Sequence, residues 1–299
     1  MTRQEIFGYE PDPKYKKAVA YFSMEFAVDQ ALKTYSGGLG FLAGSHMHSV
    51  YELKQNVIGI GMLWKYGYYD QWRELNADMK VTFIEKGYSF IEDTGIMFIV
   101  PVHDSPVWVR AFLLRPKTFG CAPIFLLTTN LNENDEQSRS ISYKLYDSTI
   151  STRIAQSIIL GIGGAMLIDK LGLNIDIYHM NEGHSLPLNF YLYNKFKRMD
   201  EVKKRVIFTT HTPEAAGNEE HKLDLLSEMS FFYGTPVDEV KKILGVPGDS
   251  LNYTVAALKF AKKANGVSKL HGEVARQMWK DNPGICEITS VTNAQNKTY

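Results

Sequence analysis

Four short motifs in the sequence hold residue types that could bind a ligand or move a proton. They are SGGLG at 36–40, NEGHS at 181–185, HTP at 211–213 and TN at 292–293. Glycine lets a backbone approach a ligand closely, histidine and glutamate can exchange protons, and asparagine can bind hydroxyl groups. Each motif follows an apolar run typical of a β-strand, so all four would meet at one edge of a parallel sheet, where ligands bind.

The glycine motif, which includes Gly38 and Leu39, lies between a strand-like run and a run with helical spacing. Backbone N–H groups at the start of a helix, together with its partial positive charge, suit a phosphate group. The motif is neither the dinucleotide-binding fingerprint nor the Walker phosphate loop. The glycines alone therefore favour a plain strand-to-helix turn, and other parts of the sequence must decide between that turn and a ligand site.

Histidine and glutamate in the next two motifs allow several roles. His211 follows a strand and precedes a proline, and a lone histidine at such a place favours a structural role. Glu182 and His184 are close in sequence, but there is no third clear metal ligand beside them, which argues against a metal site. A helix N-cap at Asn181 or Ser185 is the structural alternative for the same segment.

Other catalytic signatures are poorly supported. His46 and His48 are two residues apart in a predicted helix, so they face different sides and a shared metal is not expected. The sequence contains no GxSxG motif, and neither Cys121 nor Cys286 has an obvious histidine partner.

The composition is that of an ordinary globular protein, with 44% hydrophobic and 22% charged residues among 299. Lys+Arg and Asp+Glu both number 33 and no basic stripe stands out, so a nucleic-acid partner is not expected. Two cysteines imply no disulfide framework and fit a cytoplasmic location, and the polar N-terminus is not a signal peptide. The most apolar run, residues 158–168, is too short to span a bilayer, so no membrane association is expected.

Apolar runs alternate between strand-like and helix-like spacing, which predicts a doubly wound, Rossmann-like parallel sheet of the α/β class. The expected strands are residues 19–26, 57–64, 175–180, 206–210 and 285–291. Helices are expected over 39–55, over 143–171 and up to 196, and Gly161, Gly163 and Gly164 should allow close helix–sheet packing. Residues 79–131 instead hold four consecutive strand-like runs, which predict a β-rich insertion or sub-domain.

Six motifs occur in a characteristic order along nearly the whole chain. They are YFSMEFA (21–27), SGGLGFLAG (36–44), HMNEGHS (179–185), FTTHTP (208–213), NGVSKLHGEVARQMW (265–279) and VTN (291–293). Together they resemble the N-terminal half of an α-glucan (glycogen, starch or maltodextrin) phosphorylase of the compact bacterial kind. The resemblance implies that residues 1–299 form the N-terminal domain of a GT-B glycosyltransferase, in which two Rossmann-like domains face each other across a cleft.

The resemblance also implies an activity. Enzymes of this family transfer the terminal glucose of an α-1,4-glucan to inorganic phosphate and release glucose 1-phosphate. Pyridoxal phosphate contributes its 5′-phosphate as a proton relay in the full-length family. The resemblance therefore names an α-1,4-glucan and phosphate as the binding partners.

Carried over motif by motif, the family's roles fall on four residues around the transferred glucose. Gly38 and Leu39 would donate backbone N–H groups to the phosphate and the glucosyl unit. His211 would hold the glucose near its hydroxymethyl group, as the catalytic histidine of the site. Asn293 would bind a glucose hydroxyl.

Glu182 and His184 match a segment that lines the acceptor side of the cleft. The resemblance further implies a C-terminal domain with the basic residues for the substrate phosphate and the lysine that carries pyridoxal phosphate. No stretch of this sequence matches the motif of that lysine. We therefore expect the chain to lack the C-terminal domain and to be inactive in isolation, and a homo-oligomer stays open.

Two other functions stay open at this point. Half of a glycogen or starch synthase would share the GT-B arrangement and the glycine turn, but such enzymes usually have a lysine just before the glycines, where this chain has Ser36. A non-catalytic glucan- or partner-binding module would use the partly apolar face that half a cleft leaves exposed.

Overall fold

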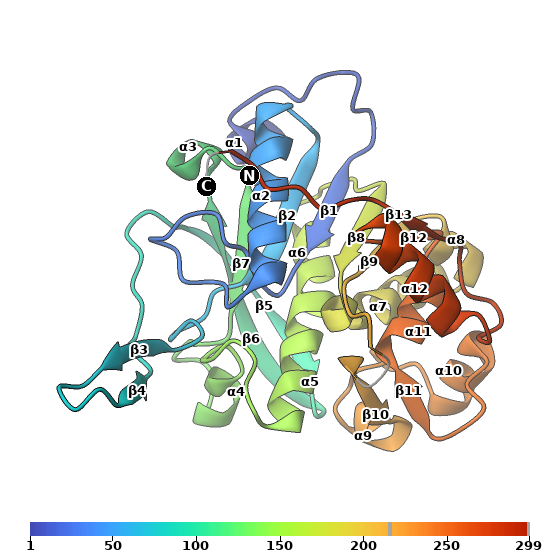
Figure 1. Ribbon diagram of the computed structural model, residues 1–299. Coiled ribbons are helices and arrows are strands. Elements are labelled where there is room, and N and C mark those ends of the chain that lie inside the picture. The colour runs from blue at the N-terminus through green and yellow to red at the C-terminus, as the bar shows by residue number, and fades with distance from the viewer. Residues whose placement is uncertain (215–216, 298–299) are drawn as a thin grey trace.

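A mostly parallel sheet of nine strands forms the centre of the computed structural model, which describes residues 1–214 and 217–297 (Figure 1). Its strands are β1 (Val19–Phe22), β2 (Val57–Met62), β5 (Glu92–Val102), β6 (Ser105–Leu114), β7 (Ile124–Thr128), β8 (Ile177–Asn181), β9 (Val206–Thr210), β12 (Lys263–Gly266) and β13 (Ile288–Ser290). They lie in the order β13-β12-β9-β8-β1-β2-β7-β6-β5. All neighbours from β13 to β7 are parallel, whereas β6 is antiparallel to both β7 and β5.

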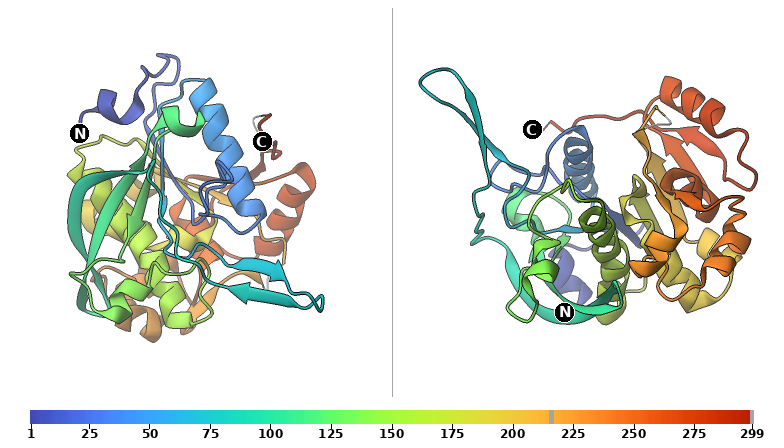
Figure 2. Two further views of the ribbon diagram at one scale, coloured as in Figure 1. Left: turned by 90° about the vertical axis from the view of Figure 1, so that its left-hand side faces the viewer. Right: turned by 90° about the horizontal axis from the view of Figure 1, so that it is seen from below.

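Helices cover both faces of this sheet (Figures 1 and 2). On one face, α2 (Gly38–Glu52) packs Met47 and Val50 against Tyr21 of β1. On the other face, the helical segment α5 (Ile150–Ile158), η1 (Ile159–Gly163) and α6 (Gly164–Lys170) packs with α7 (Pro187–Phe196) against Phe22 of the same strand. Successive strand residues thus point into opposite cores, as the period of two requires.

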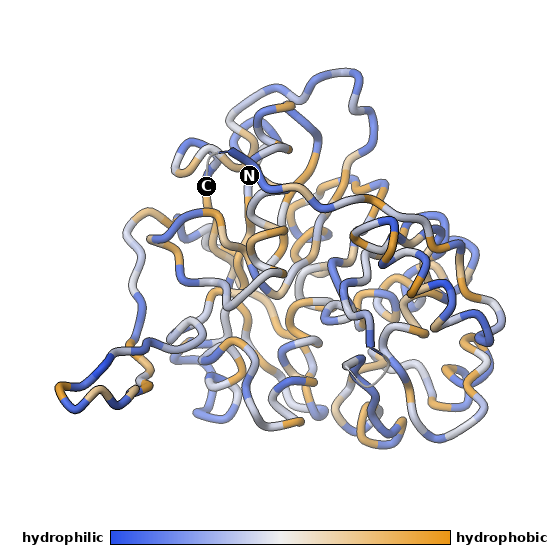
Figure 3. The backbone as a smooth tube through the Cα atoms, viewed as in Figure 1, coloured by the Kyte–Doolittle hydropathy of each residue, from blue (hydrophilic) through white to orange (hydrophobic). Residues whose placement is uncertain are grey.

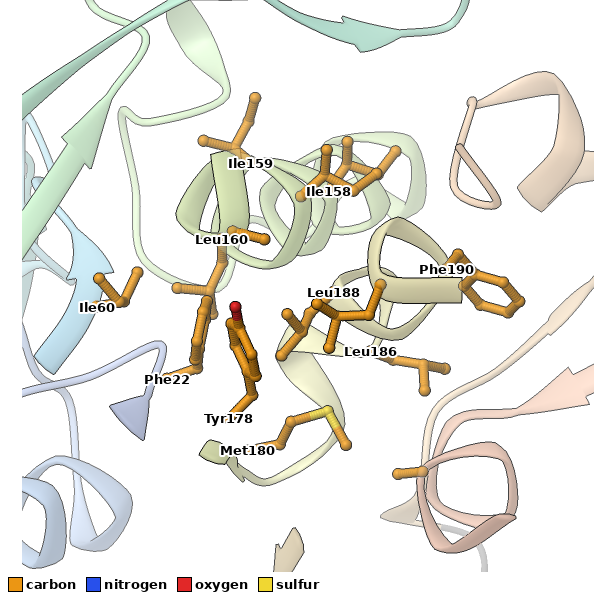
Figure 4. Close-up of a cluster of buried hydrophobic side chains, with 14 of the residues drawn as sticks. Phe22, Ile60, Ile158, Ile159, Leu160, Tyr178, Met180, Leu186, Leu188 and Phe190 are labelled. Atoms are coloured by element: carbon orange, nitrogen blue, oxygen red, sulfur yellow. The ribbon is translucent and has the colours of Figure 1, made fainter. Parts of the chain in front are cut away.

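The larger core joins the long helical segment to the sheet. Figure 4 shows Leu160, Phe22 and Ile60 directed toward one another, with Met180 and Leu188 beside them. Hydrophobic residues follow the central strands and inner helix faces, while most outer loops are hydrophilic (Figure 3). Burial of this apolar surface supplies the main driving force for the fold.

The remaining elements are short and lie around this centre. They are α1 (Arg3–Phe7), α3 (Pro116–Phe119), α4 (Glu136–Ser140), η2 (Gly183–Ser185), α8 (Met199–Lys203), α9 (Leu223–Glu228), α10 (Val237–Leu244), α11 (Tyr253–Phe260), α12 (Lys269–Trp279) and the hairpin strands β3 (Asp70–Arg73), β4 (Met79–Thr82), β10 (Glu220–Lys222) and β11 (Ser250–Asn252). The β3–β4 hairpin projects from the body of the protein in every view (Figures 1 and 2).

The strands predicted from the sequence are present, and one expectation about them is wrong. Residues 79–131 do not form a separate sub-domain, because β5, β6 and β7 continue the central sheet and only β4 belongs to the projecting hairpin. β7 is a parallel neighbour of β2, and its apolar run IFLLT is buried throughout as a strand of the central sheet. β12, between β9 and β13, was not predicted at all.

Glycines bring the long helical segment close to its neighbours, as predicted. A Cβ atom on Gly164 would lie 2.5 Å from the ring of Phe22, and one on Gly161 would lie 2.7 Å from the carbonyl oxygen of Ser185. A Cβ atom on Gly163 would have only an ordinary contact, at 3.4 Å. Two of the three glycines are therefore required by packing.

The same segment is longer than its most apolar run. From Ile150 to Lys170 it has 21 residues, and by length and composition alone it could cross a membrane. In this structure 72% of its most apolar window is buried inside the protein. The segment is packed as a core helix, which accounts for its hydrophobicity.

The glycines at the start of α2 are of two kinds: some are in close contact with other residues, and one is not. A Cβ atom on Gly44 would lie 1.8 Å from the carbonyl oxygen of Ala27, and one on Gly40 would lie 2.9 Å from Oε2 of Glu25. A Cβ atom on Gly38 would meet no atom of the described residues within 4 Å beyond its own turn. The later glycines therefore serve packing, and the first helical glycine faces open space.

We predict that Gly44→Ala lowers the free energy of unfolding by about 1–3 kcal/mol, because the helix must move away from Ala27. Gly38→Ala adds the same methyl group to the same helix at an open position. It should leave stability within about 0.5 kcal/mol of the original or raise it slightly, since alanine favours helix. Urea unfolding followed by circular dichroism compares the two variants, and equal stabilities would contradict the packing role of Gly44.

Candidate active site

Side-chain hydrogen bonds join the carboxyl ends of β1, β8 and β9 at one edge of the sheet. Asn181, the last residue of β8, donates through Nδ2 to Oγ of Ser23, just after β1, at 3.1 Å. The Oδ1 atom of Asn181 lies 2.6 Å from Nε2 of His211, just after β9. The predicted meeting of these strand ends is therefore present in the structure.

Helix α2 begins at the same edge, and its first N–H groups have no partner within the protein. Its N-cap is Gly37, which has no side chain to cap the helix. Among the described residues, no acceptor is bonded to the N–H group of Gly38 or Leu39. The start of a helix also carries a partial positive charge. These two N–H groups are thus suited to an anion.

A hollow of about 460 Å³ lies beside this helix start. Its volume falls within the roughly 300–1,000 Å³ of ordinary small-molecule sites. Its lining consists of Gly38, Phe41, Leu42, Ser45, Asn293, Ala294 and Gln295. The structure therefore brings Gly38 and Asn293 together, although they lie at opposite ends of the sequence.

Backbone contacts hold the segment that contains Asn293. Its N–H group donates to the carbonyl oxygen of Val267, which follows β12, at 2.9 Å. Further along, Nδ2 of Asn296 donates to Oγ of Ser49 on α2 at 3.0 Å. The segment therefore crosses over α2, as Figure 1 shows, and keeps the exposed Asn293 beside the helix.

A second, smaller hollow of about 100 Å³ lies at the end of β8. Glu182, His184, Arg153 and Tyr253 are among its lining residues. The buried Nδ1 of His184 and the buried hydroxyl of Tyr253 have no hydrogen-bond partner among the described residues. Such groups are usually satisfied by a ligand or by ordered water. Glu182 and His184 therefore lie together, but in a different hollow from Gly38.

Glu182 has a strained backbone, with φ at 67° and ψ at 176°. Only glycine adopts this conformation readily, and the strain costs another residue about 1–3 kcal/mol. The carboxylate accepts the N–H of His211 at 2.8 Å and the hydroxyl of Thr212 at 3.4 Å. Burial raises the pKa of Glu182 to about 7, against the lowering effect of these hydrogen bonds.

His211 and His184 are neutral at pH 7, because burial lowers the pKa of each to about 4. The Nδ2 group of Asn181 donates to Ser23, which leaves Oδ1 facing His211 as an acceptor. Nε2 of His211 must then carry the ring proton, and Nδ1 is left as an acceptor. His211 can therefore accept a hydrogen bond from a hydroxyl group at Nδ1.

Two more partly buried histidines lie behind this edge. The ring of Tyr21 is 4.8 Å from the ring of His46 and 4.9 Å from that of His179. Burial lowers the pKa of His46 to about 4 and that of His179 to about 3. His48 points elsewhere and bonds to the carbonyl oxygen of Val28 at 2.9 Å, so the predicted separation of His46 and His48 is confirmed.

Three site residues received no role from the sequence. The carboxylate of Glu25 accepts two N–H groups of the glycine motif, and the hydroxyl of Tyr146 donates to it at 2.6 Å. Arg153, on α5, lines the smaller hollow. A carboxylate directly after a buried strand, as in YFSMEF, was a usable signal for Glu25, whereas Arg153 and Tyr146 have no local motif.

Comparison with known proteins finds relatives over most of this chain. A maltodextrin phosphorylase of Thermococcus litoralis is 35% identical over 288 residues, which cover 90% of this chain and 34% of that protein. A glycogen phosphorylase of Aquifex aeolicus is 33% identical and covers 93% of this chain and 44% of its own length. Over about nine-tenths of its length, the chain is therefore related to α-glucan phosphorylases.

The matches cover only part of the length of the related proteins. An uncharacterized protein of Methanocaldococcus jannaschii is 46% identical over 283 residues, which are 95% of this chain and 54% of that protein. The chain thus spans about a third to a half of the length of the curated relatives it matches. No protein-family model matches it.

We predict that the protein loses stability as the pH falls from 7 to 5. The pKa values of His46, His179, His184 and His211 are lowered by burial, so the unfolded chain binds more protons than the folded one below about pH 6.5. The raised pKa of Glu182 has the opposite effect, because the folded state gains its proton between about pH 7 and 4.5. The four histidines outweigh the one glutamate, so the urea concentration at the midpoint of unfolding should decrease from pH 7 to pH 6 and again to pH 5.

The variant Glu182→Gln provides the control for this pH dependence. It removes the one group that opposes the loss, so the decrease between pH 7 and 5 should be steeper than in the unmodified protein. A midpoint that rises over this range would contradict a folded state with four neutral, buried histidines.

Proposed function

We propose that this chain is the N-terminal domain of a GT-B α-1,4-glucan phosphorylase, which transfers the terminal glucose of glycogen or maltodextrin to inorganic phosphate. The observation that supports this most is the hollow shared by Asn293 and the N–H end of α2 at Gly38. It lies at the start of α2, and a neutral His211 is bonded to Asn181 at the carboxyl edge of the same sheet. The named relatives are maltodextrin and glycogen phosphorylases.

In this proposal, the larger hollow binds the transferred glucose and its phosphate. The N–H groups of Gly38 and Leu39 donate to the phosphate and the glucosyl unit, where the partial positive charge of α2 favours negative charge. Nδ1 of His211 accepts a hydrogen bond from the glucose hydroxymethyl group, and the amide of Asn293 binds another hydroxyl. These residues orient the sugar and leave proton transfer to other groups.

The smaller hollow then belongs to the acceptor side of the cleft. Glu182 and His184 line it, and the unpaired polar atoms of His184 and Tyr253 suit sugar hydroxyls or the water that replaces them. The carboxylate of Glu182 is already bonded to the backbone N–H of His211. We therefore assign Glu182 to holding the loop after β9, beside the acceptor.

Pyridoxal phosphate, which the resemblance implies, finds no lysine anchor among the described residues of the two hollows. Neither hollow is lined by a lysine among the described residues, and the one cationic side chain, Arg153, is paired with Glu219. When bound, the cofactor supplies a phosphate that relays a proton. The residues present do not fit it, so the proposal places the cofactor on a second domain, outside this chain.

We predict that the isolated chain forms no glucose 1-phosphate from maltoheptaose and phosphate, even with pyridoxal phosphate added. The reason is that the cofactor anchor and the basic groups for the substrate phosphate belong to the other domain. An enzyme-coupled assay for glucose 1-phosphate measures this. The complete maltodextrin phosphorylase of Thermococcus litoralis, assayed in parallel, is the positive control.

Formation of glucose 1-phosphate by the isolated chain would contradict the division of the site between two domains. Calorimetric titration separates the alternatives, since the proposal predicts binding of glucose 1-phosphate and maltoheptaose. Tight binding of a nucleotide sugar instead would favour the synthase alternative. Binding of glucan without any response to glucose 1-phosphate would favour a non-catalytic glucan-binding module.

A further inference from the structure

A buried carboxylate holds the turn that precedes α2. Glu25 is only 2% exposed, and its Oε2 atom accepts the N–H of Ser36 at 2.5 Å and the N–H of Gly37 at 3.0 Å. The next two N–H groups of the chain are those of Gly38 and Leu39. The carboxylate thus takes the first two donors of the glycine motif and leaves the following two facing outward.

Three contacts fix the position of this carboxylate. The hydroxyl of Tyr146 donates to Oε1 at 2.6 Å, and Oγ of Ser23 donates to the backbone oxygen of Glu25 at 2.8 Å. The third is with the underside of α2, where a Cβ atom added to Gly40 would lie 2.6 Å from Cβ of Tyr35 and 2.9 Å from Oε2 of Glu25. Gly40 is therefore a glycine because both Tyr35 and the carboxylate of Glu25 lie directly against α2.

The same carboxylate stands between the two hollows. The backbone of Glu25 is bonded to Ser23, which connects it through Asn181 to His211 by bonds of 3.1 Å and 2.6 Å. Tyr146 connects it to the smaller hollow, because the ring of Tyr146 lies 5.6 Å from the ring of His184. A shift of Glu25 would therefore disturb the glycine turn first and the strand ends next.

We propose that Glu25 is a positioning residue of this site, which holds the glycine turn so that the N–H groups of Gly38 and Leu39 face the hollow shared with Asn293. This inference rests on the proposed function, in which those N–H groups bind the phosphate and the glucosyl unit. Glu25 itself does not touch the ligand. The negative charge of Glu25 disfavours a bound anion, so its electrostatic effect weakens binding. Its favourable contribution is geometric, because it holds the turn that binds the ligand.

Because geometry and charge act in opposite directions, variants of Glu25 can separate them. In the test, glucose 1-phosphate is titrated into the chain carrying ¹⁵N-labelled glycine. The amide signal of Gly38 reports binding. Glu25→Gln keeps an oxygen that can accept the two N–H groups and removes the charge, so binding should be as tight as in the original or tighter. Glu25→Ala removes the acceptor, so affinity should fall about tenfold or more. A purely electrostatic role would tighten binding in both variants and would overturn the proposal.

A second route avoids the loss of a buried group. Gly40→Ala keeps the carboxylate but places a methyl group too close to Cβ of Tyr35 and to Oε2 of Glu25, so it should disturb the turn and weaken binding as Glu25→Ala does. Circular dichroism verifies that each variant is folded. Wild-type affinity in Gly40→Ala would overturn the positioning role.

Two further outcomes separate this inference from the function on which it rests. If Gly38 responds to glucose 1-phosphate equally in the original chain and in Glu25→Ala, the ligand site stands and the role of Glu25 is wrong. If Gly38 does not respond even in the original chain, the proposed phosphate site is wrong, and the inference about Glu25 fails with it.

Discussion

The parallel pairing of β1, β8 and β9 is the constraint on which the site depends. Met180 of β8 lies opposite both Phe22 of β1 and Phe208 of β9, so the three strands end at nearly the same level. The residues that follow them can then bond directly, as Asn181 does with its neighbours on both sides. Polar groups at this edge are largely removed from water by the packed sheet, which keeps the histidines neutral.

Packing and ligand binding make separate demands on the same short motif. Gly40 and Gly44 let α2 approach the segment after β1, while Gly38 leaves an open N–H group at the helix start. Close packing of the helix also places the carboxylate of Glu25 under the turn, so the two demands are linked. Glu182 likewise combines a strained backbone with a carboxylate that accepts the N–H of His211.

Much of the fold could be predicted from apolar periodicity, and the failures have physical causes. The run VIFTT predicts the strand β9, because it is apolar and β-branched and lies between a charged stretch and a proline. The sequence KANG of β12 was missed, since it is held by backbone bonds on both sides and buries little apolar side chain. Residues 79–131 were read as a separate unit because periodicity detects strands but not the sheet that they join.

The site was predictable only in part for a similar reason. Gly38, Asn293, His211, Glu182 and His184 lie in motifs with a recognisable order. In the structure Gly38 and Asn293 line one hollow, Glu182 and His184 line another, and His211 is bonded to Asn181. Contacts that depend on long-range packing, such as the bond of Tyr146 to the carboxylate beneath the turn, leave no pattern in the sequence.

The central claim is that the free N–H group of Gly38 binds the phosphate of the ligand, and one pair of variants tests it directly. Gly38 is the first residue of α2, where proline is well tolerated and removes only the N–H group. Gly38→Ala adds bulk at the same place and keeps the donor. The affinity of the chain for glucose 1-phosphate should fall about tenfold in Gly38→Pro and stay near the original in Gly38→Ala. Equal affinities in the two variants would contradict the claim.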